Sequence, residues 1–207
     1  MMNPTPPAGR VATGQSSAGN QSMEAAERAL LALVSTGDRC AMDQLYLRYF
    51  ARLARFFQNM KVRVDLVEEL INDTMFEVWK GGASIGATAS VFLAIIRLAY
   101  SRVQKHFAEA RADEPYSQQE VQDGELSTSL LTTDTPSDLQ IFLSKLPVEE
   151  RAVVHLVYGS GCSRRETAGI MKIACDCVDV LLRDVCASAK QHFNATSAQA
   201  QEIDPRA

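Results

Sequence analysis

Apolar residues recur at intervals of three and four along two stretches in the first half of the chain. This spacing is that of one buried face of an α-helix. The first helix follows Asp38, a plausible N-cap, and the second begins at Asp65, with Glu68 in a capping-box arrangement, and runs to about Lys80. The predicted buried faces comprise Met42, Leu45, Tyr46, Tyr49, Leu53, Phe56 and Phe57 in the first helix, and Val67, Leu70, Ile71, Thr74, Met75, Val78 and Trp79 in the second.

The remaining pattern also predicts helices. A Gly-rich break at residues 81–90 (GGASIGATAS) precedes a third long helix from about Ser90 to Phe107. Shorter helices are predicted from Asp138 to Lys145 and from Pro147 to Tyr158. Period-two alternation over strand length is absent, so the predicted class is all-α.

The end of the chain has the outline of a helix-turn-helix. Ser163 and Glu166 form a capping box for a helix of about eight residues. After a tight turn, Asp176 can cap a longer helix that reaches about Phe193. A short helix, a turn and a longer helix are typical of DNA-binding domains, although short paired helices also occur in many other proteins.

Charge divides the chain into parts. The net charge of the 207 residues is −4, and most of the deficit lies in residues 108–138, where eight acidic residues accompany one basic residue. This polar segment lacks apolar periodicity and is predicted to be an acidic, flexible linker between two small helical domains. The predicted organisation is a disordered arm (1–23), a first domain (24–107), the linker (108–138), a second domain (139–193) and a flexible tail (194–207).

Composition argues against several classes of protein. The chain is too apolar, at 46% hydrophobic residues, to be wholly disordered. Its longest apolar run, Val91 to Ile96, is too short for a membrane span, and the first 21 residues lack the apolar region of a secretory signal. An odd number of cysteines, five, without a regular framework favours a reducing, cytoplasmic setting.

No catalytic or metal-ligating pattern stands out. The cysteine and histidine residues that could suggest a zinc site are Cys162, Cys175, Cys177, Cys186, His155 and His192. Their spacing does not match that of zinc sites, and no nucleophile or paired catalytic group accompanies the carboxylates of the second helix. We therefore expect no metal, no cofactor and no enzymatic activity.

The second helix has a second face, formed by Glu69, Asn72, Asp73 and Phe76. One interpretation is a solvated face that carries a single aromatic residue. The other is a binding face, because an exposed aromatic residue ringed by carboxylates suits a basic helical partner.

Residues 65–79 (DLVEELINDTMFEVW) resemble the core-binding region 2 helix of bacterial sigma factors, and in particular of the extracytoplasmic-function branch of the sigma-70 family. Gly37-Asp38 and residues 45–49 (LYLRY) match the first helices of the same domain, and Phe92-Leu93 stands where the family has its −10 element helix. Residues 146–154 (LPVEERAVV) match the start of the family's region 4.

The resemblance implies binding to core RNA polymerase, at the clamp helices of the largest subunit, through Glu69, Asn72, Asp73 and Phe76. It also implies that the third helix faces the −10 DNA with Arg97, Arg102, Lys105 and His106. In the family, the loop before this helix captures an unstacked base of the non-template strand. Here that loop carries no aromatic and no basic residue.

Region 4 of the family reads the −35 element with its last helix, usually through Lys and Arg. In this chain Asp179, Leu181 and Asp184 occupy those positions. Either the helix meets DNA in another register or the domain serves a protein partner. The candidate −35 residues are Arg164, Arg165, Asp179 and Arg183.

The predicted function is that of an RNA polymerase sigma factor, which directs core enzyme to promoters and helps to open the −10 region. An anti-sigma factor is a common partner in the family, although no residue here identifies one; no membrane partner is expected. Two alternatives remain: a sigma-like regulator or decoy without −35 reading, and a stand-alone helix-turn-helix regulator that binds DNA without polymerase.

Overall fold

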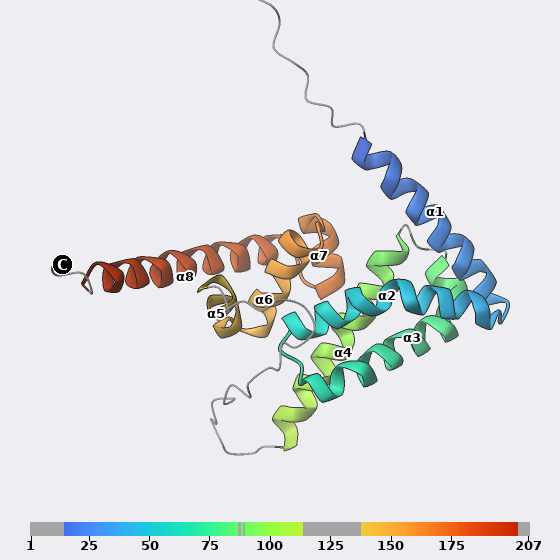
Figure 1. The fold of residues 1–207 in the computed structure, drawn as a ribbon, viewed down its shortest axis with the longest axis horizontal. Coiled ribbons are helices and arrows are strands. Elements are labelled where there is room, and N and C mark those ends of the chain that lie inside the picture. Colours follow the sequence, from blue (N-terminus) through green and yellow to red (C-terminus); the bar gives the residue numbers. More distant parts are fainter. Residues whose placement is uncertain (1–14, 87, 89, 114–137, 203–207) are drawn as a thin grey trace, which may run out of the picture.

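The structure, a computed structural model, describes residues 15–86, 88, 90–113 and 138–202. Within these ranges the chain is almost entirely helical and has no β-strand, which confirms the predicted all-α class. The first part consists of four long helices, of which α2 and α3 lie side by side while α4 crosses them (Figure 1). Their bounds are Gln15–Ser35 for α1, Arg39–Asn59 for α2, Val64–Gly86 for α3 and Val91–Asp113 for α4.

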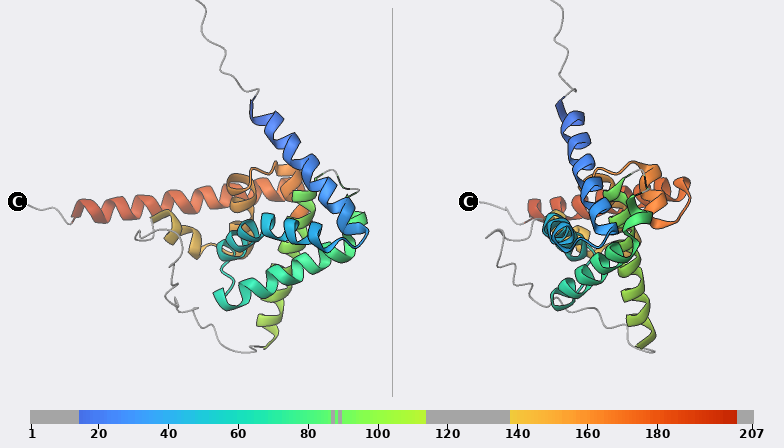
Figure 2. Two further views of the ribbon diagram at one scale, coloured as in Figure 1. Left: turned by 45° about the vertical axis from the view of Figure 1, so that its right-hand side comes forward. Right: turned by 90° about the vertical axis from the view of Figure 1, so that its right-hand side faces the viewer.

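The second part is built from shorter elements and one long helix. A π-helical turn, η1, continues α6 directly, and the second half of α8 projects away from the body of the molecule (Figures 1 and 2). The bounds are Asp138–Lys145 for α5, Val148–Val154 for α6, His155–Gly159 for η1, Arg164–Met171 for α7 and Cys175–Glu202 for α8.

One apolar core joins the two parts. Tyr49, Phe56 and Ile71 are fully buried among α1–α4. The same core continues through Tyr100 on α4 to Met171 at the end of α7, because α4 packs against α7. The two helical domains therefore lie in direct contact.

Two predicted helix starts are confirmed. Asp38 is the N-cap of α2, with its Oδ1 accepting from the backbone N–H of Ala41 at 3.1 Å. Ser163 and Glu166 form the capping box of α7. Each carboxylate or hydroxyl oxygen takes up an N–H that the first turn of a helix leaves without a partner.

The predicted capping box at Asp65 is wrong. Helix α3 begins one residue earlier, at Val64, and Asp65 lies inside its first turn. The Asp65 carboxylate instead accepts two hydrogen bonds from the Arg63 guanidinium, at 2.7 and 3.2 Å. The carboxylate forms this bidentate contact in place of a cap, because Arg63 and Asp65 are both exposed and only two positions apart.

The predicted break at Gly81 is also wrong, since α3 continues to Gly86. Packing overrides the low helix propensity of glycine. A Cβ on Gly82 would lie 3.4 Å from the backbone nitrogen of Ser35, so glycine allows the ends of α1 and α3 to approach closely. Ile85, one turn later, is buried and anchors the extension.

Three helices run past the predicted domain boundaries. Helix α1 begins at Gln15, inside the segment assigned to the disordered arm, because the prolines that exclude a helix all lie before residue 8. Helix α4 reaches Asp113 and α8 reaches Glu202, beyond the predicted ends at 107 and 193. The rest of the predicted arm (1–14), of the acidic linker (114–137) and of the tail (203–207) lies outside the described residues.

Candidate functional site

The four residues assigned to polymerase binding share one exposed face of α3. Glu69, Asn72, Asp73 and Phe76 all project to the surface, opposite the buried stripe that includes Ile71. Phe76 is 56% exposed, which is unusual for a large apolar side chain on a well-packed helix. We call these four residues the α3 face.

Contacts fix three of these four side chains. The Tyr46 hydroxyl donates to Asn72 Oδ1 at 2.8 Å, and the Lys80 ammonium lies 4.2 Å from the centre of the Phe76 ring. Asp73 pairs with Arg102 of α4 at 3.5 Å. Glu69 makes no hydrogen bond or ion pair with the residues that the structure describes, so within the α3 face its carboxylate is available to an outside cation.

The exposed apolar surface continues from α3 onto α2. Leu47 is 75% exposed, and Phe50 lies on the same side of α2, with its ring 5.7 Å from that of Tyr46. Sequence analysis missed Leu47 and Phe50 and assigned Tyr46 to the core. The available signal was that both missed residues fall outside the buried stripe of the first predicted helix.

The residues assigned to −10 DNA do not form one open surface. Arg102 is only 22% exposed, since its guanidinium contacts Asp73 at 3.5 Å and Glu77 at 3.2 Å on α3. Arg97 instead projects toward α7, with its Nη2 4.0 Å from where a Cβ on Gly169 would lie. Arg102 therefore faces α3, whereas Arg97 faces α7.

The other two −10 candidates lie further along α4. Lys105 is exposed and forms an ion pair of 3.6 Å with Glu109. The half-buried His106 packs its ring 5.3 Å from that of Phe107. Both remain near the end of the helix that points away from α7, and an exposed lysine pair of this kind is weak enough to exchange for a phosphate.

The helix-turn-helix uses its charges internally. Arg164 on α7 forms a 2.8 Å ion pair with Asp179 on α8, and Arg183 donates from Nε to the Asp179 backbone carbonyl at 3.3 Å. Arg165 is exposed and makes no hydrogen bond or ion pair with the described residues. Of the four −35 candidates, the structure therefore brings three together in mutual contact.

Polar contacts also tie the two domains to each other. His155 of η1 lies against α2, where its Nδ1 is 2.9 Å from Asn59 Nδ2 and its ring is 5.5 Å from that of Phe56. Burial, together with the nearby Arg55 guanidinium, lowers the pKa of His155 to about 4. The imidazole is therefore neutral near pH 7, so that its Nδ1 can accept the Asn59 amide proton.

Arg151 makes the second tie. Its guanidinium donates to the Met60 carbonyl at the end of α2, at 3.1 Å, and to the carbonyls of Leu143, Ser144 and Leu146, at 2.6 to 3.2 Å. Burial lowers the pKa of Arg151. Four carbonyls, rather than a carboxylate, compensate this half-buried cation, and they bind the α5–α6 corner to α2.

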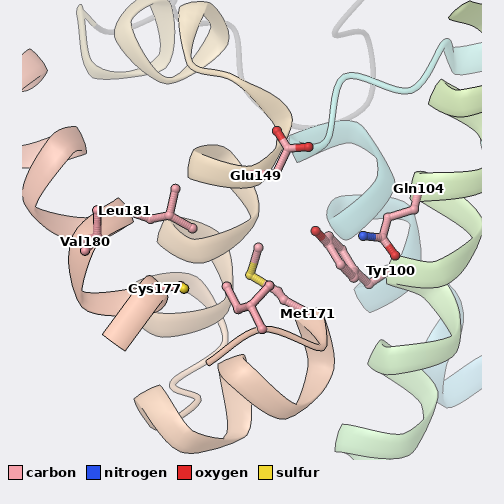
Figure 3. Close-up of a pocket in the computed structure, with 8 residues that line it drawn as sticks. Tyr100, Gln104, Glu149, Met171, Cys177, Val180 and Leu181 are labelled. Atoms are coloured by element: carbon pink, nitrogen blue, oxygen red, sulfur yellow. The ribbon is translucent and has the colours of Figure 1, made fainter. Parts of the chain in front are cut away.

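A groove of about 310 Å³ opens between the domains (Figure 3). Tyr100 and Gln104 of α4 form one wall, and the opposite wall carries apolar side chains of α7 and α8. The residues that line it are Tyr100, Gln104, Glu149, Met171, Ile173, Cys177, Val180 and Leu181.

The described residues hold no cluster of three potential metal ligands. Their cysteines are all free thiols, and burial raises the pKa of Cys162 to about 11, which keeps this thiol protonated. None of the described helices combines the length and apolar character that a membrane span requires.

Comparison with known proteins identifies relatives by sequence. No protein-family model matches the chain. The chain is 26% identical over 151 residues to the ECF RNA polymerase sigma factor SigM of Mycobacterium tuberculosis strain H37Rv. The matched residues cover 73% of this chain and 76% of that protein. SigM of strain Erdman is 27% identical over 145 residues, covering 70% of this chain and 73% of that protein.

Solved structures share the fold. CnrH, in complex with the cytosolic domain of CnrY, superposes with a TM-score of 0.59 at 17% identity, over 82% of this chain and 98% of that one. The sigma factor RpoE of Bartonella quintana, in complex with the anti-sigma factor NepR, gives a TM-score of 0.56 at 16% identity, over 73% of this chain and 96% of that one.

Proposed function

The chain is a homologue of the extracytoplasmic-function RNA polymerase sigma factors, and we propose that it directs core RNA polymerase to promoters as an initiation subunit. It acts by binding, in the cytoplasm, and has no catalytic activity or cofactor of its own. The observation that carries this proposal is the α3 face, which presents an exposed aromatic residue among acidic side chains on the helix that most resembles the family.

Core enzyme binds at the α3 face. The clamp helices of the largest polymerase subunit are a basic helical partner, so Glu69 and Asp73 supply opposite charge while Phe76 supplies the apolar anchor. Phe50 and Leu47 widen the apolar contact onto α2. The Tyr46 hydroxyl holds Asn72 in place, and burial raises the pKa of Tyr46, which keeps it a hydrogen-bond donor.

Promoter DNA binds along α4. Lys105 and His106 are the contacts of α4 with the non-template strand in this proposal, supported by the exposure of Lys105, whose ion pair with Glu109 can exchange for one with phosphate. Arg102 positions α4 on α3 through Asp73 and Glu77 more than it contacts DNA. Arg97 is exposed although its guanidinium lies beside α7, so it also remains a candidate for contact with phosphate.

Promoter binding requires the two domains to separate. The −35 and −10 promoter elements, about 25 base pairs apart, lie about 85 Å apart along B-DNA, at roughly 3.4 Å per base pair. Here α4 and α7 are in contact. The ties of His155 to Asn59 and of Arg151 to Met60 therefore break when polymerase holds the domains on the promoter.

An anti-sigma factor is the second protein partner that we propose. Two solved structures of this fold contain a partner: the cytosolic domain of CnrY in one and the anti-sigma factor NepR in the other. While the two domains are in contact, the apolar groove between α4 and α8 is open to a segment of an anti-sigma factor.

The test of the function is promoter-directed transcription. A random duplex library is selected for binding to core polymerase plus this protein, and the winning duplex serves as the template. We expect defined transcripts with the protein present and none with core enzyme alone. Phe76→Ala should lower the yield at limiting protein and Ser188→Ala, an exposed change on α8, should not. Equal transcription with and without the protein would refute the proposal.

A further inference from the structure

Helix α2 and the turn after it carry an excess of positive charge. Residues 39–63 contain six basic residues and one acidic residue, whereas residues 64–86, which form α3, contain one basic residue and five acidic residues. In the whole chain acidic residues outnumber basic ones, 25 to 21. The charged residues proposed above for polymerase and DNA all lie on other helices, so the charge on α2 has no role there.

Part of this charge lies on one exposed stripe of α2. Residues that follow one another at intervals of three and four positions line one side of a helix. On the solvent side of α2, exposed residues at this spacing are Gln44, Arg48, Ala51, Arg55 and Gln58. We call these five residues the α2 stripe. The buried residues of the same helix, such as Tyr49 and Phe56, face the core instead.

The two arginines of the stripe are available to an outside anion. Arg48 and Arg55 make no hydrogen bond or ion pair with the residues that the structure describes. The neighbouring Arg52 differs, because it pairs with Glu27 of α1 at 3.8 Å and its guanidinium lies 5.8 Å from the centre of the Phe92 ring. Arg48 and Arg55 therefore lose no internal contact when they bind another molecule, whereas Arg52 would.

The composition of the α2 stripe fits a phosphate backbone better than a protein surface. A protein partner is usually anchored by a large apolar or aromatic side chain, and the one apolar residue among these five is Ala51. Arginine and glutamine are both among the side chains that contact phosphate oxygens. Arg48 and Arg55 lie seven residues apart. That spacing is about 10 Å along the helix axis, close to the axial rise of three nucleotides in one strand of B-DNA.

We infer that the α2 stripe contacts the sugar–phosphate backbone of promoter DNA. This inference rests on the proposed function, in which DNA lies along α4. The stripe adjoins the start of α4, because Arg52, one turn from both stripe arginines, reaches the Phe92 ring in the first turn of that helix. Arg48 and Arg55 neutralise phosphates, and the two glutamines hydrogen-bond to the backbone on either side. Such contacts carry no sequence information and add affinity that depends on salt.

Three variants test the stripe. The double variant Arg48→Gln/Arg55→Gln removes both charges, and Arg48→Lys/Arg55→Lys keeps them. Arg39→Gln is the matched control, because Arg39 is also exposed on α2 but lies nine residues before Arg48. Nine residues are about two and a half turns, which places Arg39 on the opposite side of the helix. All three variants should fold normally, since the replaced side chains make no hydrogen bond or ion pair with the described residues.

The measurement is the affinity of holoenzyme for the selected promoter over a series of salt concentrations. We expect the glutamine double variant to bind roughly two- to thirtyfold more weakly. The slope of log K against log salt should become shallower by about 2, for two lost phosphate contacts. The lysine double variant should keep most of the affinity and the slope, and Arg39→Gln should match the unmodified protein. Affinity for core enzyme, measured separately, should change less than about twofold in every variant.

Unchanged promoter affinity and slope in the glutamine double variant would overturn the inference, and so would an equal loss in Arg39→Gln or in the lysine double variant. A loss of core affinity in the glutamine double variant would also overturn it, because the stripe would then face an acidic surface of polymerase. Failure of the unmodified holoenzyme to bind any selected promoter is a different result. It would refute the proposed function itself.

Discussion

The α3 face and the helix-turn-helix domain use their charged side chains in different ways. In α1–α4, the α3 face leaves Glu69 open to solvent beside the exposed Phe76. In α5–α8, Arg164 is paired with Asp179, and Arg151 is bound to carbonyls of its own domain and of α2. On the α3 face one carboxylate stays open to solvent, whereas Arg151 and Arg164 are engaged by contacts within the molecule.

The difference shows that the residue types at a surface do not by themselves make a binding site. Both surfaces were expected from the same family resemblance, and both contain the charged residues that binding requires. A charge that already has an intramolecular partner must lose that partner before it can bind another molecule. In the proposed function, we therefore expect polymerase to bind first and the second half to reach DNA only after the domains separate.

The largest expected effect concerns Arg151. Arg151→Met should lower the free energy of unfolding by about 2–4 kcal/mol, because it leaves several part-buried carbonyls without their donor. Urea denaturation followed by circular dichroism measures this loss. Arg165→Met, an exposed change on α7, should alter stability by less than about 0.5 kcal/mol. Equal effects in the two variants would mean that Arg151 does not bind the halves together.

The second prediction concerns pH. The folded protein holds His155 neutral down to about pH 4, whereas an unfolded histidine takes up a proton near its ordinary value of 6.5. The unfolded state thus binds more protons between these values, so the contribution of His155 to stability is complete above pH 6.5 and is lost as the pH falls toward 4. That loss is at most about 3–4 kcal/mol.

Denaturation at pH 7.5 and at pH 5 measures this effect. His155→Gln should remove most of the difference between the two pH values, because glutamine does not titrate. The Arg55 guanidinium opposes protonation of the same site, so Arg55→Gln should raise the folded-state pKa of His155 toward 6.5 and make the loss of stability on acidification smaller. An unchanged pH dependence in His155→Gln would show that protonation of this histidine does not destabilise the folded protein at low pH.

The fold was largely predictable because helix periodicity and local caps depend on near neighbours. Asp38, Ser163 and Glu166 cap as their spacing indicates. The break at Gly81 was mispredicted, since the packing of Gly82 on Ser35 joins residues far apart in the sequence.

The candidate site was predictable only in part. The common face of Glu69 and Phe76 follows from helix geometry, and the structure confirms that both are exposed on α3. The ion pair of Arg102 with Glu77 and that of Arg164 with Asp179 could not be predicted, because each joins different helices whose relative placement depends on the whole core.

The third prediction sharpens the contrast at the helix-turn-helix. Asp179→Asn removes the partner of Arg164 and one repulsive charge, so the holoenzyme should bind its selected promoter about three- to tenfold more tightly, with a steeper dependence on salt. Asp176→Asn changes the net charge equally without releasing Arg164. If both variants gain the same affinity, the gain comes from net charge and not from the released arginine.

The smallest expected effect concerns Arg102. Arg102→Gln removes two partly exposed ion pairs, with Asp73 and Glu77, and should cost about 0.5–1 kcal/mol of stability. It also releases Asp73 for an outside cation, so core affinity should stay the same or rise slightly in a binding titration. A strong loss of core affinity would show that Arg102 itself contacts polymerase.

Binding to sigma-free core RNA polymerase tests the central claim most directly. Glu69→Arg reverses an exposed charge without breaking an internal contact, and Asp73→Arg reverses a second charge on the same face. We predict tight binding by the unmodified protein, a loss of about thirtyfold or more in each variant, and full binding by Ser188→Arg on α8. Undiminished binding by both α3 variants would contradict the account, because the face left open to solvent would then not be the face that binds polymerase.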